Sequence, residues 1–144
     1  MTERQKNIKA RFEGMQNALT ECGLNGCFFL ALVSIAEEST QSKIDLLDAI
    51  VKAKQADLIK NDFFVNDSAG VLSLLTGKKW RRTIVTPSEL KEPIAENVYT
   101  VEKWVGTTGY THFRRRYVDT VKNSQTVKNG KLACYYTFTD LSAE

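Results

Sequence analysis

The chain has 144 residues, of which 42% are hydrophobic and 26% are charged, and its formal net charge is +3. This composition excludes a disordered chain, which would be poorer in apolar residues, and a collagen-like or low-complexity chain, which would hold far more than 8 Gly and 2 Pro. The length predicts one domain over residues 1–144. Because His112 is the one histidine, sites built from several imidazoles are excluded, and we expect no metal and no other cofactor.

The first half of the chain has the residue spacing of helices. Apolar residues recur between positions 5 and 19 at intervals of four, three and four, which predicts an amphipathic helix that breaks at Glu21. The stretch that begins at Cys27 is apolar nearly all round, which predicts a buried helix. Ser42 followed by Asp45 predicts the capped start of a third helix that reaches Leu58, and a shorter helix is expected over 67–77.

The second half changes to the composition of strands. Residues rich in Val, Thr, Tyr and Trp predict strands over 80–86, 98–105 and 110–118, and Pro87 and Pro93 confine the segment between them to a loop or a sheet edge. Asn129 and Gly130 are typical of a hairpin turn that joins residues 125–128 to 131–138. Because helices come first and antiparallel strands second, the sequence predicts an α+β fold.

Charge and apolar runs also bear on where the chain works. The start is charged and no apolar stretch follows it, and the longest apolar run, over 27–36, is about half the ~20 residues of a membrane helix. We therefore expect a cytoplasmic protein with no membrane partner. The balance of 20 basic and 17 acidic residues is too even to predict nucleic-acid binding from charge alone. Three cysteines do not indicate a disulfide framework, so thiols are available for chemistry.

Cys27 is the first candidate for a nucleophile. It lies in the first turn of the predicted buried helix, where the helix dipole and unpaired N–H groups favour a thiolate. A thiol nucleophile needs a base within hydrogen-bond reach, and His112 is the one imidazole that could serve. A helix that supplies the cysteine and a later antiparallel sheet that supplies the histidine is the arrangement of papain-like thiol hydrolases.

Several short motifs resemble a known family in their order and spacing. They are the run from Gly26 through Cys27 to Leu30, the stretch over 66–80, the triplet Thr111-His112-Phe113 and the stretch over 126–132. On these motifs, residues 22–138 resemble small uncharacterised spirochaete and phage proteins of the papain-like cysteine peptidase superfamily. The resemblance implies a papain-like fold in which Cys27 attacks an amide or thioester of a peptide or protein substrate and His112 acts as the base.

A second thiol fits a different resemblance. Gln16 lies six residues before Cys22, and this part of the chain is similar to the start of the bacteriocin-processing peptidases, in which a glutamine at that spacing helps to form the oxyanion hole. A side-chain amide can donate a hydrogen bond to a developing oxyanion, whereas Glu21, six residues before Cys27, cannot. We favour Cys27 because the apolar helix begins there, with Gln16 as an oxyanion donor and Cys22 as the alternative nucleophile.

A third catalytic residue would orient the imidazole. The resemblance assigns this role to Asp119, on the strand after that of His112. Seven residues of continuous strand span roughly 23 Å, so Asp119 reaches His112 only if the chain reverses between them. Asn123 and Asp140 are the alternatives for this position.

Three consecutive arginines, Arg114, Arg115 and Arg116, indicate another kind of function. A strand that alternates into a core does not place three guanidinium groups in a row, so at least one of them faces inward, lines a cleft or lies in a turn. Together with the cations of residues 78–82 they suit an acidic partner, while the few aromatic residues around them do not support base stacking. The alternative hypothesis is a papain-like fold whose catalysis has lapsed and which, encoded by a phage, binds or inhibits a host protein through this basic patch.

Overall fold

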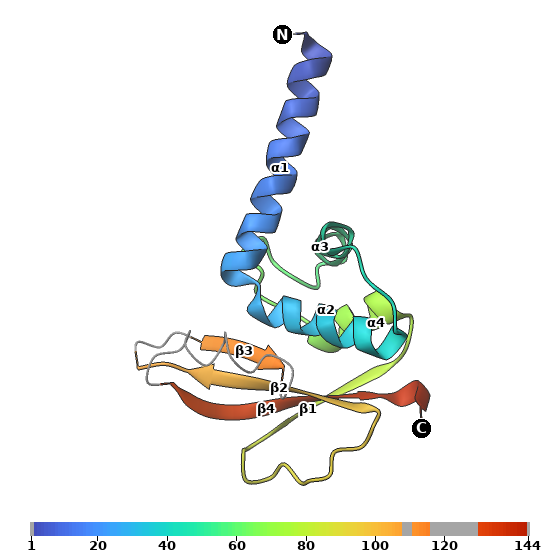
Figure 1. The fold of residues 1–144 in the computed structure, drawn as a ribbon, viewed down its shortest axis with the longest axis vertical. Helices are drawn as coiled ribbons and strands as arrows, with labels where there is room; N and C mark the ends of the chain where they lie inside the picture. Colours follow the sequence, from blue (N-terminus) through green and yellow to red (C-terminus); the bar gives the residue numbers. More distant parts are fainter. Residues whose placement is uncertain (1, 108–110, 116–129, 144) are drawn as a thin grey trace.

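A computed structural model describes residues 2–107, 111–115 and 130–143, with the side chains of these residues except at positions 8, 12, 15 and 18–25. Within these residues, helices come first and strands second (Figure 1). The helices are α1 (Glu3–Asn25), α2 (Cys27–Thr40), α3 (Leu46–Gln55) and α4 (Ser68–Thr76). The strands are β1 (Trp80–Val85), β2 (Val98–Val105), β3 (Thr111–Arg115) and β4 (Lys131–Asp140), followed by a short 3-10 turn, η1 (Leu141–Ala143).

Helix α1 extends away from the rest of the molecule and meets it at its C-terminal end (Figure 1). There it contacts α2 and α3. The predicted break at Glu21 is wrong, because the helix continues through Gly23 to Asn25 and Gly26 alone separates it from α2. One glycine inside a helix costs about 1 kcal/mol relative to alanine, which contacts with neighbouring helices can offset.

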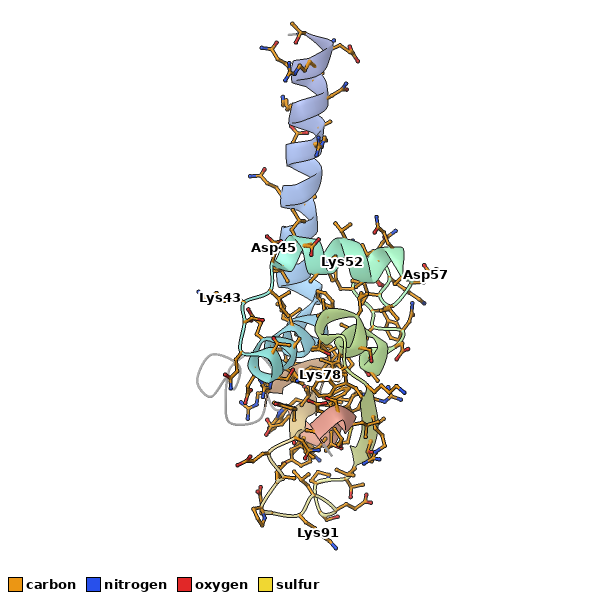
Figure 2. All side chains as sticks on the ribbon, turned by 90° about the vertical axis from the view of Figure 1, so that its right-hand side faces the viewer. Lys43, Asp45, Lys52, Asp57, Lys78 and Lys91 are labelled. Carbon is orange, nitrogen blue, oxygen red and sulfur yellow. The ribbon has the colours of Figure 1, made fainter. Side chains whose placement is uncertain are left out.

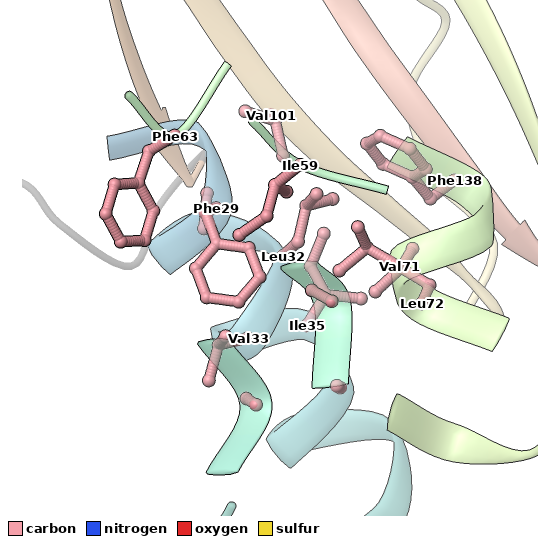
Figure 3. Close-up of a cluster of buried hydrophobic side chains, with 14 of the residues drawn as sticks. Phe29, Leu32, Val33, Ile35, Ile59, Phe63, Val71, Leu72, Val101 and Phe138 are labelled. Carbon is pink, nitrogen blue, oxygen red and sulfur yellow. The ribbon is translucent and has the colours of Figure 1, made fainter. Parts of the chain in front are cut away.

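Helix α2 lies at the centre of the core, as its apolar sequence predicts. Phe29, Leu32 and Ile35 on it have no exposed surface. Burying a side chain of this size stabilises a fold by about 1.5–3 kcal/mol, so α2 carries a large part of the hydrophobic stabilisation. In Figure 3 these side chains point towards apolar residues of α4, of the segment after α3 and of the sheet, namely Val71, Leu72, Ile59, Phe63, Val101 and Phe138.

The caps of α3 and α4 follow from short polar side chains. The Asp67 carboxylate accepts a hydrogen bond from Gly70 N at 2.9 Å and Gly77 ends α4 in the left-handed conformation, which confirms the predicted helix over 67–77. For α3 the N-cap is Asp45, which accepts from Asp48 N at 2.9 Å, rather than Ser42. The helix therefore begins three residues later than expected and ends before Leu58.

The four strands form one antiparallel sheet in the order β1-β4-β2-β3. Helices α2 and α4 lie over one face of this sheet, and α3 lies on the far side of them (Figure 1). The α+β prediction is confirmed. The predicted hairpin at Asn129 and the end of the predicted strand over 110–118 lie outside the described residues, and the single domain stays a prediction.

Candidate functional site

A cavity of about 760 Å³ opens beside the N-terminal end of α2. Its walls come from α2, from the segment that precedes α4 and from all four strands of the sheet. Apolar side chains supply most of the lining: Phe28, Phe63, Phe64, Val65, Phe113 and Tyr136. The polar residues at its wall are Cys27, Asp62, Asn66, Arg82, Lys103 and Thr111. An apolar concave site with a few polar groups is the usual form of a ligand site.

Three aromatic rings make one wall of this cavity rigid. Phe28 of α2 stacks on Phe113 of β3, with ring centroids 4.2 Å apart. Tyr136 of β4 meets Phe28 edge-on at 5.4 Å and Phe113 at 5.6 Å. Aromatic pairs in these geometries contribute about 0.5–1.5 kcal/mol beyond the area they bury. The wall is therefore fixed in place by contacts between three separate elements.

Cys27 is the first residue of α2 and lies at the cavity wall. Its side chain is partly exposed and forms no disulfide. Gly26, the N-cap, has no side chain that could accept a hydrogen bond from the amides of the first turn. The thiol therefore lies at the positive end of a helix and within reach of a ligand in the cavity.

His112 lies on the other face of the sheet from Cys27. Phe113 stacks on Phe28, and Arg115 bonds to Ser34 of α2, so these residues of β3 face the helices. Successive side chains of a strand point to opposite faces, which directs His112 away from α2. His112 is 7% exposed, pairs in register with Trp104 and is not among the described residues that line the cavity. The structure therefore does not bring the predicted nucleophile and the predicted base together.

The other predicted catalytic residues do not join Cys27 either. Gln16 is exposed on α1 and is not among the described residues that line the cavity. Cys22 lies in α1, but its side chain is not among those that the structure describes. Asp119 and Asn123 lie outside the described residues as well.

Asp140 cannot orient His112. His112 pairs with Trp104, and Trp104 pairs with Leu132 of β4. Asp140 lies eight residues further along β4, which is roughly 26 Å at the rise of an extended strand. Its carboxylate is bonded instead to Lys78 at 3.1 Å and to Ser142.

The predicted basic patch is also different in the structure. Arg114 and Arg115 point to opposite faces of the sheet, and each is used in an ion pair. Arg114 Nε lies 2.5 Å from the Glu102 carboxylate, and the Arg114 side chain is 19% exposed. Arg115 Nη1 donates to Ser34 Oγ at 3.0 Å and Nη2 lies 2.7 Å from the Glu38 carboxylate. Arg115 faces inward, as the sequence predicts for at least one of the three arginines, so Arg114 and Arg115 do not share one face. Arg116 lies outside the described residues, and partner binding through this segment stays a prediction.

The cations at the cavity are Arg82 and Lys103. The Arg82 guanidinium lies 5.7 Å from the ring centroid of Tyr136, and Lys103 Nζ lies 6.0 Å from that of Phe113. Within the part of the chain that the structure describes, neither forms an ion pair, and Asp62, the one carboxylate at the wall, accepts from Phe64 N at 3.1 Å. The sequence patterns did not single out Lys103 as a site residue. A lysine at an inward-facing position of a predicted strand is the pattern that could have indicated it.

Two further properties concern metals and membranes. Among residues 2–107, 111–115 and 130–143, no group of three or more His, Cys, Asp or Glu side chains is placed to hold a metal ion. None of the helices in this part of the chain has the length and apolar character needed to cross a bilayer.

Comparisons with protein-family models, with curated proteins and with solved structures found no match to this chain.

Proposed function

We propose that the chain is a papain-like domain in which thiol catalysis has lapsed, and that it binds an extended acidic segment of a peptide or protein in the cavity beside Cys27. The observation that carries this proposal is the placement of Cys27 and His112 on opposite faces of the sheet. A thiol without a base in reach is poorly equipped for acyl transfer, whereas the cavity itself is formed and open.

The chemistry of the cavity wall supports an anionic ligand with an apolar body. The rings of Phe28, Phe113 and Tyr136 offer a flat apolar surface. Arg82 and Lys103 lie over these rings, where each cation can meet a carboxylate while the ligand body covers the aromatic surface. Apolar contact supplies affinity and the cations select the charge of the ligand.

A binding assay with defined peptides tests this function. The probe is a fluorescently labelled peptide with adjacent glutamates between valine and phenylalanine, compared with the same peptide carrying lysines. We expect the acidic peptide to bind and the basic one not to bind.

Lys103→Glu and Phe113→Ala should each weaken binding by about tenfold, or ~1.4 kcal/mol. Arg11→Glu, the same change of charge on the exposed part of α1, is the matched control and should bind as the unmodified chain does. Equal binding of both peptides, or no effect of either cavity variant, would contradict the proposal.

The position of Cys27 favours thiol hydrolysis as a second candidate function. In that reaction the sulfur attacks an amide or thioester carbonyl, the leaving group departs as an amine or thiol, and water then cleaves the acyl-enzyme. The base required for these steps is His112, so its removal separates the two functions.

Alkylation by iodoacetamide, followed at each cysteine by peptide mass spectrometry, makes this separation. Hydrolysis requires that Cys27 reacts much faster than Cys134 and that His112→Ala slows it. The binding function predicts that His112→Ala leaves the rate at Cys27 unchanged, because the sheet lies between the two side chains. A slower rate at Cys27 in the His112→Ala variant, with the fold intact by circular dichroism, would overturn the binding function in favour of hydrolysis.

A further inference from the structure

Strand β1 is an edge of the described sheet, and no other described strand pairs with its outer side. Among the described strands it pairs with β4 alone, in an antiparallel register that runs from Trp80 opposite Asp140 to Val85 opposite Tyr135. The residues from Arg81 to Ile84 are all exposed, and Ile84 is 49% exposed although it is a large apolar side chain. An edge strand that is solvated on both faces can accept a further strand.

The backbone groups that point outward can be identified from one hydrogen bond. The Lys79 carbonyl accepts from Leu141 N at 3.0 Å, so at Lys79 the backbone faces β4. Residues of an antiparallel strand alternate between facing a neighbour and facing away from it. The N–H and C=O groups of Arg82 and Ile84 therefore point to the open edge. Within the described residues, no backbone group of a loop or helix bonds to either of them.

Charge at this edge selects the kind of strand that it accepts. Lys79, Arg81 and Arg82 lie along it and are exposed. A second copy that paired antiparallel through the same edge would bring the two sets of arginines together, and like charges directly opposite one another destabilise a pair of strands. An extended segment with carboxylates opposite Arg81 and Arg82 and an apolar side chain opposite Ile84 would instead form favourable cross-strand pairs.

We propose that an extended acidic segment of a partner protein adds to β1 as a fifth strand of the sheet. Arg82 belongs both to this edge and to the lining of the cavity, so side chains on one face of the added strand would lie at the rim of the cavity. The segment that would add to β1 is the same acidic segment that the cavity is proposed to bind, so strand addition rests on the proposed function. Its support, however, comes from the unpaired backbone groups of β1 and not from the aromatic wall.

N-methylated peptides test strand addition, because a methyl group removes a backbone donor and leaves the side chains unchanged. The probe is the labelled acidic peptide of the binding assay, made in two versions that are N-methylated at alternate residues, one at odd and one at even positions. A strand added to β1 uses the donors of one alternate set only. We therefore expect one version to lose at least about tenfold in affinity and the other to bind within a few-fold of the unmodified peptide.

A variant of the chain provides the complementary measurement. Ile84→Pro removes the outward N–H of β1 at a place where an edge strand tolerates proline. We expect it to keep the thermal melting profile and to lose about tenfold in affinity for the peptide. If both methylated versions bind like the unmodified peptide while Phe113→Ala still weakens binding, strand addition is wrong and the cavity function stands. If no peptide binds, strand addition and the cavity function are both wrong. If sedimentation then shows concentration-dependent dimers that Ile84→Pro abolishes, the edge of β1 binds a second copy of the chain instead.

Discussion

At the scale of single residues, Asp140 links the end of the sheet to the helical layer. Its Oδ2 atom lies 3.1 Å from Lys78 Nζ, and its Oδ1 atom accepts from the backbone and the hydroxyl of Ser142. Burial alone would raise the pKa of Asp140, but the hydrogen bonds from Ser142 and Lys78 outweigh it and hold the pKa below its ordinary value. The folded state therefore binds the proton of Asp140 less tightly than the unfolded chain does.

This difference predicts how stability depends on pH. Because the folded-state pKa is lowered, ionised Asp140 stabilises the folded state at pH values above the unfolded-state pKa of about 4. This stabilisation is lost as the pH falls through the lower pKa of the folded state. We expect Asp140→Asn to lower the free energy of unfolding by about 2 kcal/mol at neutral pH and to make less difference in acid. Urea unfolding over a pH series measures this. Asp48→Asn, which removes an exposed ion pair with Lys52, is the control and should cost less than about 1 kcal/mol. A constant cost of Asp140→Asn at all pH values would contradict the linkage.

The Arg115 side chain is buried and bonds to another element of the fold. Its side chain is 6% exposed and joins β3 to α2 through Glu38 and Ser34. Removing a buried charged donor leaves its partners without their hydrogen bonds, so Arg115→Ala should lower the free energy of unfolding by about 2–3 kcal/mol. Arg82→Ala, at an exposed position, should change it by less than about 0.5 kcal/mol. Chemical denaturation compares the two variants, and equal costs would show that Arg115 has no special structural role.

At the scale of elements, two glycines of the helices have opposite roles. Gly77 ends α4 with a φ of 71°, a left-handed conformation that strains any residue with a Cβ atom. Gly14 lies inside α1, where a Cβ atom would meet no neighbour within 4 Å. Gly77→Ala should therefore lower the melting temperature by the equivalent of about 1 kcal/mol, while Gly14→Ala should have no effect or raise it slightly. Calorimetry of both variants tests this, and a loss in Gly14→Ala equal to that in Gly77→Ala would be inconsistent with these placements.

At the scale of the whole molecule, α1 is the least supported part of the described structure. Its first half stands clear of the other elements in two perpendicular views (Figure 1, Figure 2), and its described side chains up to Asn17 are exposed. A helix without tertiary packing is marginally stable in water. Among the described side chains, those of this part of α1 are not members of the core around α2.

Truncation tests this division of the molecule. We expect a chain that begins at Gly14 to keep its melting temperature within about 2 °C of that of the full chain, because the described side chains among the removed residues are exposed. In the full chain, hydrogen exchange should be fast at amides 5–13 and slow in α2. A large loss of stability on truncation would show that the first half of α1 packs against the body in solution.

The sequence by itself determined the type and order of the described helices and strands, because these depend on local properties, although it did not predict that α1 continues to Asn25. The apolar composition of α2 requires burial, and the cap of α4 by Asp67 and Gly77 needs only a few neighbouring residues. The start of α3 was missed by three residues, since Ser42 and Asp45 are both good caps and only the packed structure chooses between them.

Only the tertiary structure decided the site. Cys27, Arg82 and Phe113 come from three distant elements, and their meeting depends on the order β1-β4-β2-β3, which no local pattern contains. The side-chain period of a strand is two, so a shift of one residue in the register of β3 would exchange the faces of His112 and Phe113. The sequence could therefore identify His112 as the candidate base, but it could not predict the face on which His112 lies. In the register of β3 with β2, Phe113 packs against Phe28, and His112 therefore points away from the thiol.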